Sequence, residues 1–160
     1  AQYLKKTGSP RVGVVGFCMG GALTLGALAA SDDIAAGAPF YGVNFGLFDS
    51  KTLKKPVQGH FGALDTMEGF SDPATGKRLE KELPNAKVFI YEGVGHAFMN
   101  PEPAPFSTFE ERREKMGFPA YDMGQADLAW GRLLDFFLTH LAAPPPGRTD
   151  LPIHTPATEL

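Results

Sequence analysis

Residues 13–22, Gly-Val-Val-Gly-Phe-Cys-Met-Gly-Gly-Ala, are the part of the sequence that indicates the fold most clearly. An apolar run rich in β-branched residues leads into Gly-x-Cys-x-Gly, and a stretch of small residues with helical character follows. This pattern is typical of a nucleophile elbow, a tight strand-to-helix turn that strains the backbone of the residue at its tip. We expect the turn to require small residues at Gly16 and Gly20. We also expect Gly21 to let the helix approach the sheet.

The predicted turn gives the thiol of Cys18 a distinctive environment. The helix that follows points its N-terminus at the thiol, so that backbone N–H groups and the helix dipole favour thiolate over thiol. The same pattern also fits a buried cysteine in a glycine-rich turn. Other residues of the chain must distinguish a reactive cysteine from a packed one.

Length and composition indicate a globular protein. The chain has 160 residues, of which 43% are hydrophobic and 13 are Phe, enough for one packed domain. We assign this domain to residues 1–142, and we expect the Pro-rich tail, residues 143–160, to be loosely ordered. The single cysteine of the chain, Cys18, cannot form an internal disulfide. We expect a cytoplasmic protein.

Charge and hydropathy exclude two classes of partner. The net charge is −3 and no basic block is present, which argues against nucleic acid. No apolar run is long enough to span a bilayer, so we expect no membrane partner. A small-molecule substrate is the expected partner, and the oligomeric state is not indicated by the sequence.

Strand-like and helix-like segments alternate along the chain. We expect strands at residues 11–16, 35–41, 57–62 and 87–91, and helices at residues 1–6, 20–30, 71–83, 108–115 and 121–141. This alternation predicts an α/β protein with a mostly parallel sheet and helices on both faces. Asp72 and Asp122 are expected to cap helices. In the last helix the spacing of Trp130, Leu134 and the residues Phe137 and Leu141 predicts a buried apolar stripe.

Three residues suited to nucleophilic catalysis follow the ends of three different strands. Reactive groups of parallel sheets gather at the carboxyl ends of the strands. Cys18 would be the nucleophile, His96 the general base, and Asp65 the group that fixes the imidazole tautomer. Their order in the chain is that of α/β-hydrolases. Individually, Asp65 also fits a turn or capping residue, and His96 also fits a chance loop histidine.

The other histidines do not indicate a metal site. His60, at the end of a predicted strand, is expected to be a packed or surface residue. No two histidines have the spacing of metal ligands. We therefore expect neither a metal nor another cofactor.

Three motifs resemble the dienelactone hydrolase (carboxymethylenebutenolidase) family. They are Gly-Phe-Cys-Met-Gly-Gly at 16–21, Gly-Ala-Leu-Asp at 62–65 and Gly-Val-Gly-His-Ala-Phe at 93–98. The resemblance covers residues 1–141 and implies an α/β-hydrolase fold that cleaves a small ester or lactone through an acyl-enzyme. By position, it assigns a catalytic triad to Cys18, His96 and Asp65, and one oxyanion-hole N–H to Met19. We expect Tyr41 and Phe98 to contact the substrate.

The chain departs from the family at its N-terminal side. Family members are longer there, so the resemblance implies that this chain is the C-terminal portion of such a fold. The first strands, a second oxyanion donor and a glutamate near the resting cysteine would then lie outside it. We expect the strand at 11–16 to expose an unpaired apolar edge that favours aggregation. We also expect the chain alone to be weakly active or inactive.

A second departure concerns the substrate. Members that process dienelactone carry an arginine shortly after the histidine to hold the substrate carboxylate. Here residues 98–100 are Phe-Met-Asn, and no arginine follows His96 before Arg112. This favours a less charged ester or lactone. Two alternatives are a non-catalytic member of the fold and a glutamine-amidotransferase or protease-like cysteine enzyme, although the latter usually has an acid close after its histidine.

Overall fold

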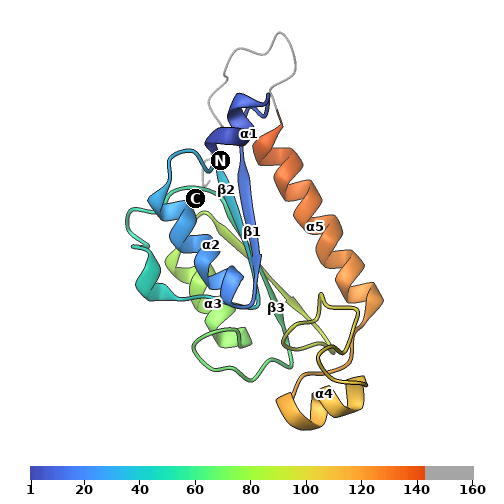
Figure 1. Ribbon diagram of the computed structural model, residues 1–160. Coiled ribbons are helices and arrows are strands. Elements are labelled where there is room, and N and C mark those ends of the chain that lie inside the picture. Colours follow the sequence, from blue (N-terminus) through green and yellow to red (C-terminus); the bar gives the residue numbers. More distant parts are fainter. Residues whose placement is uncertain (143–160) are drawn as a thin grey trace, which may run out of the picture.

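A computed structural model describes residues 1–142, which form a parallel sheet between two layers of helices (Figure 1). The predicted tail at residues 143–160 lies outside the described residues. Four strands follow one another across the sheet in chain order: β1 (Gly13–Phe17), β2 (Ala36–Phe40), β3 (Val57–Gly62) and β4 (Ala86–Tyr91). Every neighbouring pair is parallel because a crossover returns the chain to the same edge before each new strand. The expected strands are confirmed: β3 has the expected bounds, and the ends of the other three differ by at most two residues.

Helices cover both faces of the sheet, as the sequence predicts. The described helices are α1 (Gln2–Lys6), α2 (Met19–Ala30), the short 3₁₀ helix η1 (Phe45–Leu47), α3 (Pro73–Glu82), α4 (Phe109–Met116) and α5 (Met123–Leu141). Helices α2 and α3 lie on one face and α5 on the other (Figure 1). None of the helices described within residues 1–142 is long and apolar enough to cross a membrane.

Two apolar cores result from this arrangement, one on each face of the sheet. The core under α2 and α3 contains Leu25, Leu28, Val57, Phe61, Leu79, Leu83 and Val88. The core under α5 contains Ala36, Ala38, Phe40, Tyr91, Ala129, Leu133 and Phe136. Strands β2 and β3 are buried along their whole length. The sequence of β2, Ala-Gly-Ala-Pro-Phe, is apolar as expected for a strand buried on both faces, whereas β3 also buries the polar side chains of Gln58 and His60.

The predicted buried stripe of α5 is wrong in its position on the helix. Trp130 is 43% exposed and Leu134 is 63% exposed, while Phe137 and Leu141 are only partly buried against the core. The buried face instead consists of Ala126, Ala129, Leu133 and Phe136. The two alanines let the helix approach the sheet closely. Periodicity predicts a helix here, but α5 has apolar residues on adjacent faces, and spacing alone does not say which face turns inward.

Aspartates cap two helices, as predicted. Asp72 accepts hydrogen bonds from the N–H groups of Ala74 and Thr75 at the start of α3. Asp122 accepts one from the N–H of Gln125 at the start of α5. Each carboxylate thereby satisfies helix donors that have no acceptor within the helix.

Strand β1 forms one edge of the sheet in the described part of the chain, where it pairs only with β2. Val15 and Phe17 on this strand are 38% and 36% exposed. This arrangement agrees with the expected exposure of an apolar edge. The aggregation that we expect from it remains a prediction.

Candidate active site

The turn between β1 and α2 has the geometry of a nucleophile elbow. Cys18 lies at its tip with φ 55° and ψ −120°, a region that non-glycine residues rarely adopt. The Cys18 N–H donates to the carbonyl of Phe40 at 3.0 Å, which ties the turn to β2. A Cβ atom on Gly16 would lie 2.1 Å from the carbonyl oxygen of Gly20, so no side chain fits at that position.

The other two glycines of the motif differ from each other. A Cβ atom on Gly21 would lie 2.5 Å from the carbonyl oxygen of Phe40, which confirms that this glycine lets α2 approach the sheet. At Gly20 the expectation is wrong, because a Cβ placed there would point into open space. Apart from its chain neighbours and the backbone of its own helix, nothing in residues 1–142 lies within 4 Å of it. The carbonyl group of Gly20 crowds Gly16, but among the described residues the space where a side chain on Gly20 itself would lie is empty.

The structure brings Cys18, His96 and Asp65 together at the carboxyl ends of their strands. His96 Nε2 lies 3.1 Å from Cys18 Sγ, and His96 Nδ1 lies 2.8 Å from Asp65 Oδ2. The carboxylate of Asp65 accepts, so the imidazole hydrogen resides on Nδ1 and the Nε2 lone pair faces the thiol. Such an imidazole can remove the thiol proton.

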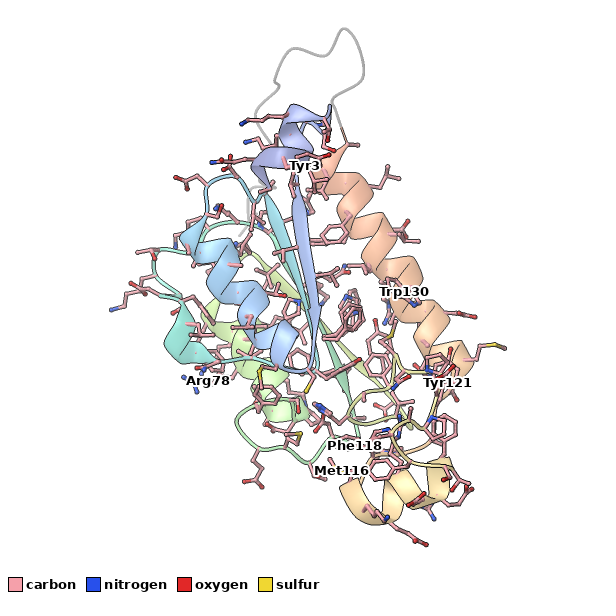
Figure 2. The ribbon with its side chains drawn as sticks, viewed as in Figure 1. Tyr3, Arg78, Met116, Phe118, Tyr121 and Trp130 are labelled. Carbon is pink, nitrogen blue, oxygen red and sulfur yellow. The ribbon has the colours of Figure 1, made fainter. Side chains whose placement is uncertain are left out.

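Two aromatic rings and a buried hydroxyl hold the imidazole of His96 in place. Its ring packs against those of Tyr41 at 5.1 Å and Phe118 at 4.8 Å, and Phe118 comes from the segment between α4 and α5 (Figure 2). Ser71 Oγ lies 3.1 Å from His96 Nδ1. Sequence reasoning does not predict this role for Ser71, because a serine before a helix has the signature of a cap. Only the folded loop shows that it faces His96.

A cavity of about 450 Å³ opens beside Cys18. It is lined by Phe17, Cys18, Tyr41, Ala97, Met99, Asn100, Pro101 and Trp130. Trp130 comes from α5 (Figure 2) and its ring lies 6.2 Å from that of Phe17. The spacing of apolar residues predicts a core position for Trp130, because helical spacing cannot separate a core face from a cavity wall.

Of the two predicted substrate contacts, Tyr41 lines the cavity and Phe98 does not. Phe98 is 1% exposed and packs in the core under α5, 5.0 Å from the ring of Tyr91. The backbone of Ala97 has φ 59°, and the chain turns so that Ala97 and Met99 face the cavity while Phe98 points inward. Phe98 therefore supports the wall of the cavity from behind.

Tyr41 contributes a neutral aromatic surface to the cavity. Burial, together with the nearby Cys18, raises the pKa of its phenol well above its usual range, an effect that Arg112 partly opposes. The phenol therefore stays protonated at neutral pH. Like Cys18, Tyr41 has a positive φ, at 35°, at the end of its strand.

Arg112 is buried behind this region and bonds to backbone. Its Nη2 donates to the carbonyl of Pro119 at 2.9 Å and its Nη1 to that of Glu102 at 3.4 Å. These bonds hold together the two ends of the segment between Met99 and α5. Arg112 is absent from the described lining of the cavity, so it does not replace the arginine that the sequence lacks after His96.

His60 is a packed core residue, in agreement with one of its two predicted roles. Its ring stacks on Phe40 at 4.0 Å, and its nitrogens contact Tyr91 Oη at 2.8 Å and Gln58 Oε1 at 3.0 Å. Burial, assisted by the charge of Arg132, lowers the pKa of His60 to about 3. Across the described residues 1–142, no three His, Cys, Asp or Glu side chains are grouped to hold a metal ion.

The parallel sheet, the elbow and the order of the three residues define an α/β-hydrolase fold. A solved structure supports this fold: the putative dienelactone hydrolase of Klebsiella pneumoniae superposes with a TM-score of 0.56 at 21% identity. The alignment covers 79% of this chain and 51% of that one.

Sequence comparison gives the family. The chain matches the dienelactone hydrolase family over residues 1–141, and it belongs to that family. Protein usf of Aquifex pyrophilus is 31% identical over 138 residues, covering 84% of this chain and 54% of the relative. A putative carboxymethylenebutenolidase of Aquifex aeolicus is 28% identical over 134 residues, covering 82% of this chain and 52% of the relative. This chain thus spans about half the length of these curated relatives.

Proposed function

We propose that the protein hydrolyses small esters or lactones, with Cys18 as nucleophile, His96 as general base and Asp65 as the group that orients the imidazole. One observation carries the proposal: His96 Nε2 is 3.1 Å from Cys18 Sγ while its Nδ1 is 2.8 Å from Asp65 Oδ2. Both distances are within the range needed for proton transfer and tautomer control. Membership of the dienelactone hydrolase family supports the same reaction class.

The reaction would proceed in two halves. His96 Nε2 takes the thiol proton, and the Cys18 sulfur attacks the ester carbonyl to form a tetrahedral intermediate. The intermediate collapses as His96 returns the proton to the leaving alkoxide, which leaves a thioester on Cys18. His96 then deprotonates a water molecule that attacks the thioester, and the acid product departs as the thiol is regenerated.

The oxyanion of each tetrahedral intermediate needs hydrogen-bond donors. Met19 is the first residue of α2, so its N–H has no acceptor within the helix and lies next to the nucleophile. We assign it one half of the oxyanion hole. The positive end of the α2 dipole supports negative charge at the same place.

The cavity favours a neutral, apolar acyl group. Its large lining side chains include Phe17, Tyr41, Met99 and Trp130, and none of the lining residues found in the described chain is Lys, Arg, Asp or Glu. A carboxylate placed there would lose its hydration without gaining a cationic partner. We therefore propose neutral esters or lactones over anionic ones.

Paired p-nitrophenyl esters test the reaction and the preference together. Because residues 1–160 alone are expected to be weakly active or inactive, the assay uses a form of the protein as long as its relatives. It should release p-nitrophenol from the butyrate ester, and kcat/KM for the mono-succinate ester should be at least about tenfold lower. Equal rates would contradict the neutral preference while leaving the reaction class intact. An absence of turnover on both esters, with Cys18 unmodified, would instead favour the alternative of a non-catalytic member. The family assignment does not favour a glutamine-amidotransferase-like enzyme.

A further inference from the structure

Two oxygen atoms approach the same nitrogen of His96. Asp65 Oδ2 lies 2.8 Å from Nδ1, and Ser71 Oγ lies 3.1 Å from it. Ser71 is 0% exposed and Asp65 is 5% exposed, so bulk water does not compete with either contact. The distance of Ser71 is that of a hydrogen bond.

The loop between β3 and α3 fixes the two oxygens relative to each other. The N–H of Met67 donates to Asp65 Oδ1 at 3.1 Å, and the carbonyl of Met67 accepts from the N–H of Ser71 at 3.0 Å. Asp65 and Ser71 are thus tied to the same residue from opposite ends of the loop. Asp72, which caps α3, also accepts from the N–H of Gly69 at 2.9 Å and closes the loop further.

We propose that Ser71 is a positioning residue for His96, whose hydroxyl oxygen is a second acceptor for the Nδ1 hydrogen. A carboxylate only accepts, so Asp65 keeps the hydrogen on Nδ1, and Ser71 Oγ receives a share of the same N–H. The share matters most when His96 has taken the thiol proton and carries a positive charge, because hydrogen bonds from charged donors are the stronger ones.

The surroundings of His96 make this contact measurable. The titratable groups that face its ring are Cys18, Asp65 and Tyr41, and burial keeps the Tyr41 phenol neutral. Phe70 and Phe118, the other rings against it, carry no charge. If Ser71 stabilises the imidazolium, its removal must make the thiolate–imidazolium pair harder to form, and the pair then forms at higher pH.

Alkylation of Cys18 tests the proposal directly, since Cys18 is the one cysteine of the sequence. The rate of reaction with iodoacetamide is measured against pH for the parent protein and for Ser71→Ala. We expect the midpoint of the profile to move to higher pH by about half a unit to one unit, with an alkylation rate about threefold to tenfold lower below the midpoint. A Ser71→Ala profile that superimposes on the parent profile overturns the proposal.

Matched variants separate this role from a loss of packing. Thr75→Val removes a buried hydroxyl that bonds Asp72 and does not contact His96, so its profile should match that of the parent. Ser71→Thr keeps the hydroxyl and should also keep the parental midpoint. In Ser71→Val the side chain has nearly the shape of threonine but no hydroxyl, so the midpoint should move to higher pH. If Ser71→Ala does not fold, the Thr and Val variants alone decide the question: equal midpoints for the two contradict the proposal.

The inference rests on the proposed pairing of Cys18 with His96, but not on ester turnover. Alkylation needs no substrate, so its result is independent of the hydrolase assignment. A midpoint shift in a protein that cleaves no ester would leave the inference standing and remove the proposed function. Ester hydrolysis with no shift for Ser71→Ala would do the reverse.

Discussion

His96 Nε2 lies 3.1 Å from Cys18 Sγ, although the two residues are 78 positions apart in the chain. Parallel strands produce this proximity, because every crossover returns the chain to the same edge and the carboxyl ends of β1 and β4 point the same way. The elbow raises the thiol above β1, and the turn after β4 brings the imidazole to it.

Replacing Asp65 with Asn should impair the base without removing it. An amide can donate to His96 Nδ1, which permits the tautomer with the hydrogen on Nε2, facing the thiol. We expect kcat for a p-nitrophenyl ester to fall by about a hundredfold or more. Circular dichroism should show an intact fold. A fall of less than about threefold would contradict the orienting role of Asp65.

Two glycines of the elbow, Gly16 and Gly20, should differ in how much an added side chain destabilises the protein. Gly16→Ala would place Cβ 2.1 Å from the backbone carbonyl of Gly20, which cannot rotate away. We expect a loss of about 2 kcal/mol or more in the free energy of unfolding. Gly20→Ala is the matched control and should stay within about 1 kcal/mol of the parent. Chemical denaturation of both variants measures the difference, and equal stabilities would contradict the described geometry.

Trp130 should determine affinity for apolar acyl groups. Trp130→Ala removes a large part of the cavity wall without touching the reacting groups, so KM for the butyrate ester should rise about fivefold to thirtyfold while the alkylation rate of Cys18 stays unchanged. Leu134→Ala, one turn further along α5 and outside the cavity lining, serves as the control. An equal rise in KM for both variants would point to a general loosening of α5 and not to the cavity.

His60 should make the fold sensitive to mild acid. Its pKa is lowered to about 3 in the folded protein from an ordinary 6.5, so below pH 6.5 the unfolded chain binds a proton that the folded chain does not. The free energy of unfolding therefore takes its full value above pH 6.5 and decreases as pH falls toward 3. Between pH 7 and pH 5 this decrease is about 2 kcal/mol. His60→Gln cannot titrate. Urea unfolding at both pH values should show that the parent loses about that much more stability than the variant, and parallel losses would refute the assignment.

Much of the fold follows from the sequence. The four strands lie within two residues of their predicted ends, and Gly-x-Cys-x-Gly predicts the elbow because so few residues tolerate that turn. Cys18, Asp65 and His96 could be grouped in advance because parallel strands gather their carboxyl ends at one edge. Local sequence was sufficient to predict those features, such as the elbow, that steric limits on a few neighbouring residues determine.

Tertiary packing decided the features that the sequence did not predict. Trp130 is expected in the core but lines the cavity, and Phe98 is expected to contact substrate but lies in the core. The face of α5 that turns inward, and the direction of the side chain after Ala97, depend on the residues packed opposite them. Ser71 lies close to Asp65 in the chain, but its approach to His96 Nδ1 depends on how the intervening loop closes. Gly20 lies in a motif without being crowded, which only the surrounding atoms reveal.

Rapid-quench mass spectrometry of the protein shows whether Cys18 forms an acyl-enzyme during ester hydrolysis. The protein is mixed with p-nitrophenyl acetate, quenched in acid and digested to locate any acetyl group. We predict a mass increase of one acetyl group on the peptide that contains Cys18, and this acetyl group should form together with the burst of p-nitrophenol. The mass increase should be absent from Cys18→Ala and strongly reduced in His96→Gln. Hydrolysis that proceeds at the parental rate in Cys18→Ala, or an acetyl group found only on other residues, would contradict the account.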